Sequence, residues 1–126
     1  MKYLFLFLFF SVAAQSQVAQ YGKVNKKSTF DAYITKAGNT IKAGDTIHIK
    51  LPSTDTGFMY ISQGQQKVSA MLADTKVEVD KIKSYGNKKR GYKVYLHFKG
   101  YGMLPVLIDY ETALIADEIY NPFNQD

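Results

Sequence analysis

Residues 82–98 read IKSYGNKKRGYKVYLHF, and this stretch has the pattern of a β-hairpin. Gly86 and Gly91 bracket a loop whose tip is cationic. After the loop, one set of alternate positions holds Tyr92, Val94, Leu96 and Phe98, and the other holds Lys93, Tyr95, His97 and Lys99. A period of two is typical of a half-buried strand, because successive side chains point to opposite faces of a sheet. The stretch therefore predicts two antiparallel strands joined by a short loop.

Shorter segments on both sides of the hairpin also look like strands. They are residues 30–35, 47–51, 58–62, 76–80 and 103–110. Gly38-Asn39 and Gly44-Asp45 each predict a turn between strands. Gly suits such turns because it adopts positive φ, and Asn or Asp can hydrogen-bond the backbone two residues on.

The pattern becomes helical only near the C-terminus. Asp109 is expected as the N-cap of a helix over Tyr110–Glu118, with Glu111 in the first turn, where the helix dipole favours a carboxylate. Together the elements predict a mainly β protein. The expected architecture is a small single-domain antiparallel barrel or sandwich, with about six to seven short strands and one short C-terminal helix.

The chain begins with MKYLFLFLFFSVAAQSQ, which has the three parts of a secretory signal peptide. Lys2 precedes the apolar run Tyr3–Ala14, and small residues allow cleavage after Ala14 or Ser16. As a helix, the apolar run would be about 18 Å long, which is too short for a hydrocarbon core of about 30 Å. We therefore expect residues 1–16 to be removed during export. The mature protein would be periplasmic or extracellular and would have no transmembrane anchor.

About 110 residues remain after such cleavage, which is enough for one domain with a modest core. Residues 17–27 are polar and predict a flexible lead-in, and residues 28–123 predict a single β-rich domain. The chain has no cysteine, which excludes disulfides, thiol catalysis and cysteine-based metal sites. The net charge of +5 becomes +4 without Lys2, so the surface is mildly basic.

Several short motifs resemble those of a known group of proteins. They are Gly44-Asp45-Thr46-Ile47, Leu51-Pro52-Ser53, Phe58-Met59-Tyr60-Ile61 and the stretch Ile82–Ile119, with KSYGNKKRGYKVYLHFKGYG and ETALIADEI. With these motifs, residues 28–120 resemble small exported β-rich proteins of Bacteroidota-type bacteria. The resemblance implies a location outside the cytoplasm and carries over no catalytic motif.

Cations and aromatic rings share the predicted hairpin. The cations are Lys81, Lys83, Lys88, Lys89, Arg90, Lys93 and Lys99, with Tyr85, Tyr95 and His97 among them. Such a surface suits an anionic partner. The candidate binding residues are Lys88, Lys89, Arg90, Lys93, Tyr95, His97 and Lys99. In an exported protein the expected partner is a polysaccharide, a lipid head group or an acidic protein of the envelope, rather than nucleic acid. The alternative is a solubilising hairpin whose lysines discourage edge pairing.

Carboxylates offer an enzymatic alternative. Asp55-Thr56-Gly57 matches the triplet of aspartic proteases, but the flanking residues do not fit those enzymes, and a turn is the preferred interpretation. Glu78 and Asp80 lie two apart on a predicted strand, so their carboxylates would be about 7 Å apart, as in inverting glycosidases. Both would face solvent beside Lys76. A small hydrolase using Asp55 or Glu78/Asp80 is therefore the second hypothesis.

Two further possibilities concern ligands. His48 and His97 lie on the polar faces of their strands, but no close-spaced histidine pair is present, so neither a metal nor another cofactor is expected. A ligand-carrying barrel would need an internal void, whereas Leu96, Phe98 and Ile108 predict a filled interior. The leading hypothesis is an exported, non-enzymatic β-domain that binds or supports an envelope partner through the basic and aromatic hairpin.

Overall fold

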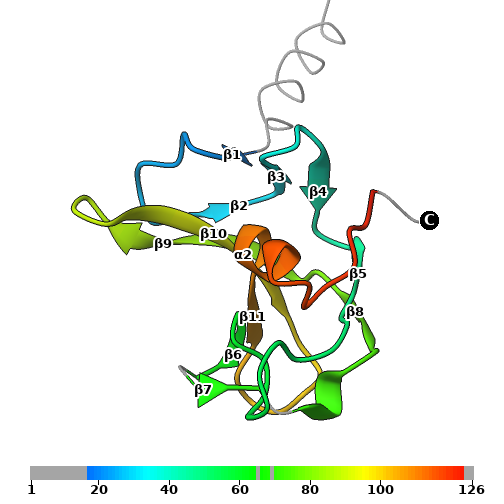
Figure 1. The fold of residues 1–126 in the computed structure, drawn as a ribbon. Coiled ribbons are helices and arrows are strands. Elements are labelled where there is room, and N and C mark those ends of the chain that lie inside the picture. The colour runs from blue at the N-terminus through cyan, green and yellow to red at the C-terminus, as the bar shows by residue number, and fades with distance from the viewer. Residues whose placement is uncertain (1–16, 65, 69, 124–126) are drawn as a thin grey trace, which may run out of the picture.

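The computed structural model describes residues 17–64, 66–68 and 70–123, and it is mainly β, as predicted. The strands are β1 (Val18–Gln20), β2 (Thr29–Phe30), β3 (Ala32–Ile34), β4 (Thr40–Lys42), β5 (Thr46–His48), β6 (Ile61–Gln63), β7 (Gln66–Lys67), β8 (Lys76–Glu78), β9 (Lys81–Asn87), β10 (Gly91–Phe98) and β11 (Val106–Asp109). The 3-10 helix η1 spans Ala70–Leu72, and helix α2 spans Tyr110–Ile115. Figure 1 shows the three-stranded sheet β1-β3-β4 lying over one end of the six-stranded sheet β2-β9-β10-β11-β6-β7.

The predicted hairpin is the centre of the six-stranded sheet. Strands β9 and β10 pair antiparallel over their whole length, from Asn87 opposite Gly91 to Lys81 opposite His97. Gly86 allows the two strands to approach closely next to the loop, because a Cβ at this position would lie 2.1 Å from the Gly91 carbonyl oxygen. The inward side of β10 is the predicted one, since Val94, Leu96 and Phe98 are all buried.

The strands are shorter and more numerous than the sequence predicted, and they form an open arrangement. Within the described residues, the six-stranded sheet ends at β2 and β7, which do not pair with each other. The layered alternative is therefore formed and the closed barrel is not. The pairs are antiparallel except β1 with β3, which is parallel. Strand β1 lies in the stretch predicted as a flexible lead-in, and its Ala19 is buried.

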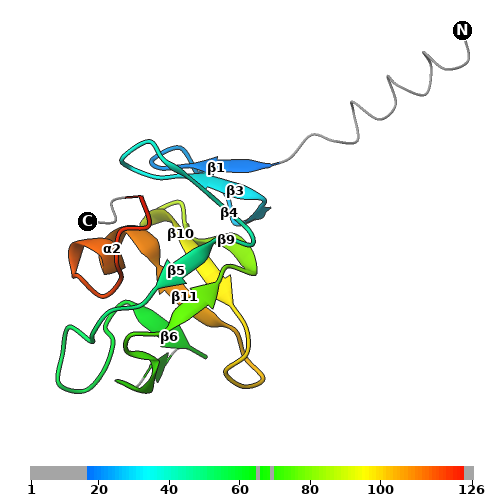
Figure 2. The same ribbon diagram turned by 90° about the vertical axis from the view of Figure 1, so that its right-hand side faces the viewer.

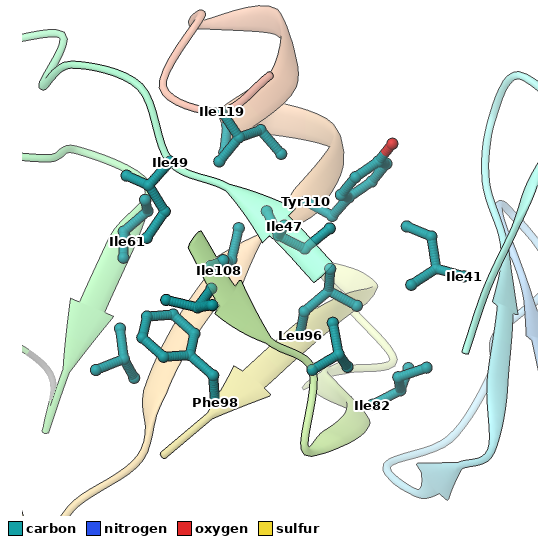
Figure 3. Packing of buried hydrophobic residues seen from close by; sticks show 14 of the residues in the cluster. Ile41, Ile47, Ile49, Ile61, Ile82, Leu96, Phe98, Ile108, Tyr110 and Ile119 are labelled. Atoms are coloured by element: carbon teal, nitrogen blue, oxygen red, sulfur yellow. The ribbon is translucent and has the colours of Figure 1, made fainter. Parts of the chain in front are cut away.

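One continuous apolar core joins the sheets. Figure 3 shows side chains from several strands and from the C-terminal segment converging, among them Ile47, Ile49, Ile61, Leu96, Phe98, Ile108, Tyr110 and Ile119. The large residues predicted to fill the interior do so, because Leu96 and Ile108 are fully buried and Phe98 is 1% exposed. These side chains pack against one another in the middle of the protein.

Helix α2 is shorter than predicted but begins at the predicted residue, Tyr110. It ends at Ile115, and Asp117 then adopts a left-handed backbone conformation with φ of 62°. Glu111, in the first turn, accepts hydrogen bonds from the Tyr33 hydroxyl and from the Lys36 N–H. These bonds connect the helix to the three-stranded sheet, so one carboxylate ties two layers together.

The predicted signal peptide, residues 1–16, lies outside the described residues. Over the ranges that are described, no helix combines the length and apolar character that crossing a membrane requires. The β9–β10 hairpin extends from the layered core in Figure 1, and the β10–β11 connection extends from it in Figure 2.

Candidate functional site

The surface of the six-stranded sheet that faces away from the core carries the predicted cations and rings. We call it the outer face and define it by Lys81, Lys83 and Tyr85 on β9 and by Lys93, Tyr95 and His97 on β10. Across the two strands, Lys81 lies opposite His97, Lys83 opposite Tyr95, and Tyr85 opposite Lys93. Directly opposite residues of antiparallel strands have neighbouring side chains. Each ring of the outer face therefore has a lysine beside it.

The three rings form an ordered cluster. The Tyr85 ring lies nearly parallel to the His97 ring, with centroids 5.8 Å apart and an interplanar angle of 10°. It meets Tyr95 edge to face at 5.5 Å. The Tyr85 hydroxyl and His97 Nε2 are 3.1 Å apart, which is hydrogen-bond distance. Lys27 adds a cation from the segment before β2, with its Nζ 5.6 Å from the Tyr85 ring centroid. The rings are thus held in place rather than free to rotate.

Burial shifts the pKa values of all three rings toward their uncharged forms. The pKa of His97 is lowered by burial and further by the positive charges of Lys83 and Lys81. Burial also raises the pKa of the Tyr85 hydroxyl, and burial with the nearby Asp109 charge raises that of Tyr95. The positive charge of the outer face therefore comes from its lysines alone.

The outer face is hollowed beside the ring cluster. An open hollow of about 390 Å³ has Tyr85, Tyr95 and His97 among its lining residues. Leu104, Pro105 and Leu107 also line it, from the β10–β11 connection and from β11. The sequence did not indicate these apolar residues as part of the site, because the β10–β11 pairing that brings Leu107 opposite His97 has no local signal.

The predicted binding residues are spread along the hairpin. The loop residues Lys88, Lys89 and Arg90 are exposed at its tip, where the Arg90 N–H donates to Asn87 Oδ1. Tyr95 and His97 lie together on the outer face, near the other end, but His97 is only 4% exposed, so the prediction that it contacts a partner is wrong and it instead supports the Tyr85 ring. Strand β10 has eight residues, so at about 3.3 Å per residue it separates the tip from Lys99 by roughly 25 Å. The predicted set is therefore an elongated surface rather than one compact pocket.

Two of the predicted cations have acidic partners. Lys93 Nζ lies 2.8 Å from Asp109 Oδ2 and 3.2 Å from the Thr112 hydroxyl. The hydrogen bond with Asp109 raises the pKa of Lys93, so this lysine stays charged, but its charge is balanced. Lys99 lies 3.5 Å from Asp80. The sequence did not reveal the Lys93–Asp109 pair, because it joins strands whose register is set by the whole sheet.

The carboxylates considered for hydrolysis lie in different surroundings. Asp55 is exposed in a tight turn, in which the Thr54 hydroxyl donates to the Gly57 carbonyl at 2.6 Å. Glu78 and Asp80 line an open hollow of about 590 Å³, and Lys99 and Lys76 line it as well. The structure thus places Glu78 and Asp80 together beside lysines, and it does not place Asp55 with them.

The two histidines have separate partners. His48 Nε2 lies 2.7 Å from Asp74 Oδ1, and its ring lies 4.3 Å from that of Tyr120. His97 instead contacts Tyr85, as described above. In the ranges that the structure describes, no three His, Cys, Asp or Glu side chains gather closely enough to hold a metal ion.

Comparison with known proteins does not assign a function to this site. No family model, no curated protein and no solved structure matches the chain. The resemblance to exported β-rich proteins therefore stays a prediction, and function has to be inferred from the residues themselves.

Proposed function

We propose that this chain is an exported, non-enzymatic protein that binds an anionic partner through the outer face and the tip of the β9–β10 hairpin. The observation that carries the proposal is the cross-strand register, which sets a lysine beside each of Tyr85, Tyr95 and His97. The N-terminal segment, residues 1–16, would direct the protein to the cell envelope before it is removed.

The charge distribution supports an anionic partner. Among the residues that the structure describes, Lys81, Lys83 and the tip residues Lys88, Lys89 and Arg90 form no salt bridge, whereas Lys50, Lys93 and Lys99 each have an acidic partner. Unbalanced cations on one elongated surface attract anions and increase their rate of association. The tip and the outer face together therefore offer a run of contacts to an extended anionic partner.

The rings support a partner that also has apolar surface. Tyr85 and Tyr95 are half-buried, so each ring is fixed at one side and available at the other. A tyrosine ring can pack against an apolar group while its hydroxyl stays in contact with water. Acidic polysaccharides and lipid head groups combine negative charge with such surface. An acidic protein would use the lysines in the same way.

The test compares charge removal on this surface with equal charge removal elsewhere. Lys88, Lys89 and Arg90 are replaced together by Ser, and binding to immobilised dextran sulfate is measured against neutral dextran. We expect affinity for dextran sulfate to fall about tenfold or more, and to fall for wild type as salt is raised. Lys93 stays in place because its loss would leave buried Asp109 without its partner.

The control is the triple replacement of Lys23, Lys26 and Lys42 by Ser, which removes the same charge from exposed positions outside the hairpin. A second variant, with Lys81 and Lys83 replaced by Ser, tests the outer face separately from the tip. If the control and the tip variant lose the same affinity, binding reflects net charge only and the proposed surface is wrong.

A further inference from the structure

The connection between β10 and β11 displays apolar side chains to solvent. In this loop, Gly100–Pro105, Met103 is 101% exposed, Leu104 is 56% exposed and Tyr101 is 43% exposed. Both views of the ribbon show the connection projecting from the end of the sheet (Figures 1 and 2). Exposed apolar side chains gathered on one loop mark an interaction site more often than single exposed ones do.

The loop is held in one shape by groups outside it. The side-chain amide of Gln63 donates to the carbonyls of Tyr101 and Leu104, both at 2.8 Å. The Tyr101 ring packs edge to face on buried Phe98, with centroids 5.6 Å apart. A Cβ at Gly64 would lie 2.7 Å from Leu104 Cδ1, so glycine there allows the loop to approach β6. These contacts present Met103 on an ordered backbone.

The chemistry along the loop changes in the order found across the surface of a lipid bilayer. Lys99, with a side chain 70% exposed, comes first, amphipathic Tyr101 follows, and then come apolar Met103, which is fully exposed, and Leu104, which is 56% exposed. Lysine binds lipid phosphates, tyrosine settles at the head-group level, and apolar side chains enter the acyl region. Flexible apolar side chains on a loop suit the fluid interior of a bilayer, because binding there does not require a groove of matching shape.

The apolar tip is continuous with the basic surface. Leu104 and Pro105 line the same hollow as Tyr95 and His97, and Lys81 lies opposite His97 on the neighbouring strand. We infer that this protein binds the surface of an anionic lipid bilayer, with Met103 and Leu104 inserted and the outer-face lysines against lipid phosphates. The inference rests on the proposed function for the role of the lysines and names lipid as the anionic partner.

The test uses vesicles and a protein that begins at residue 17, because an apolar leader would itself bind lipid. The described core cluster lies entirely after that point, and circular dichroism checks that the fold is kept. Sedimentation is measured with vesicles of phosphatidylcholine containing phosphatidylglycerol and with phosphatidylcholine alone. We expect binding to the anionic vesicles. Replacing Met103 and Leu104 together by Ser should weaken it about tenfold or more, because the apolar contribution scales with inserted surface.

The matched control replaces Met71 and Ile115 by Ser. These side chains are 82% and 79% exposed, so the change in surface hydrophobicity is similar, but Met71 lies in η1 and Ile115 is the last residue of α2, so neither belongs to the loop. Equal losses in both double variants would overturn the inference. Binding of a Met103→Ser variant to dextran sulfate should stay unchanged, because Met103 does not line the hollow beside the rings, and this separates loss of insertion from loss of the proposed anion binding.

A second measurement reports insertion directly. The chain has no tryptophan, so Met103→Trp introduces a single fluorophore at the tip. Its emission should shift to the blue with anionic vesicles, and the shift should be absent with dextran sulfate. If wild type binds dextran sulfate but neither kind of vesicle, and the emission does not move, lipid insertion is wrong and the tip is left for a protein partner.

Discussion

Glu118 is a fully buried carboxylate that the fold surrounds with hydrogen-bond donors. It accepts four hydrogen bonds, from the N–H and hydroxyl of Ser53 and from the N–H groups of Met59 and Tyr60. Burial alone would raise the pKa of Glu118, but these bonds hold it below the ordinary value. One side chain near the C-terminus thus fixes the segment that leads into β6.

Replacing Glu118 by Ala should destabilise the protein by about 3 kcal/mol or more, because three backbone N–H groups would lose their acceptor in a buried place. The free energy of unfolding in urea at pH 7 measures the loss. The same change at exposed Glu78 is the control, and we expect it to alter stability by less than about 0.5 kcal/mol.

The pH dependence identifies the charged form as the stabilising one. Because the pKa of Glu118 is lower in the folded than in the unfolded protein, its contribution is present above about pH 4.5 and is lost as pH falls further. The difference between wild type and the Glu118→Ala variant should therefore shrink in acid. A difference that stays constant down to pH 3 would contradict this role for the carboxylate.

Nothing in the local sequence indicates this role. The prediction placed Glu118 as the last residue of a helix, where a glutamate is normally exposed. The helix ends earlier, at Ile115, and the positive φ of Asp117 turns the next side chain inward. Its donors come from residues 53–60, so only the folded chain brings acceptor and donors together.

At the level of elements, the sequence correctly predicted which side chains of β10 face the core. In β10, Val94, Leu96 and Phe98 are buried as expected, whereas on the opposite face His97 is also buried, at 4% exposed, beneath the Tyr85 ring. Alternation does not hold in β3, where the consecutive residues Ala32 and Tyr33 point to opposite faces and are nevertheless both buried. Tyr33 is covered by the C-terminal helix, because its ring packs on Tyr110 and its hydroxyl donates to Glu111, so a period of two does not mark a single inward face in β3.

The hairpin itself depends on Gly86, whose φ is +145°. A methyl group there would overlap the backbone of the opposite strand, so Gly86→Ala should lower the free energy of unfolding by about 2–4 kcal/mol. It should also weaken dextran sulfate binding, because the tip would lose its shape.

Gly91→Ala at the same turn is the control. Its φ is +85° but the space around it is open, so only the cost of the left-handed conformation, about 1–2 kcal/mol, applies. Equal losses of stability at the two positions would show that strand contact at Gly86 is unimportant. Thermal and urea unfolding measure both.

The arrangement of the whole molecule could not be predicted, because it depends on contacts between distant residues. The three-stranded sheet is joined to α2 through Glu111. Its carboxylate accepts hydrogen bonds from the Tyr33 hydroxyl and the Lys36 N–H, which lie more than seventy residues earlier in the chain. The candidate site shows the same division. The cations and rings of the site were evident in one stretch of sequence. The pairing of β10 with β11 was not evident, and it is this pairing that sets Asp109 beside Lys93 and brings the apolar loop residues beside the rings.

Two buried tyrosines should limit stability in alkali. Tyr33 and Tyr110 are each 1% exposed, and their rings meet edge to face with centroids 6.2 Å apart. Burial and the nearby Glu111 charge raise the pKa of Tyr110 to about 12. Burial, followed by the hydrogen bond and charge of Glu111, raises that of Tyr33 as well. In the unfolded chain both hydroxyls would ionise near pH 10.

The sign follows from linkage. A group whose pKa is raised by folding stabilises the protein fully below its unfolded pKa, and that contribution is lost as pH rises above it. Unfolding free energy should therefore fall from about pH 10 upward, by roughly 1.4 kcal/mol per pH unit for each tyrosine until its folded pKa is reached. Urea titrations from pH 8 to 12, with tyrosinate absorbance as the probe, measure the decline.

In the Tyr110→Phe variant the free energy of unfolding should decline less steeply with pH, whereas Tyr120→Phe, at an exposed position, should leave the decline unchanged. If Tyr110 ionised near pH 10 in protein that is still folded, the buried pair would have no such effect, and the decline would have to arise from the loss of lysine charge instead.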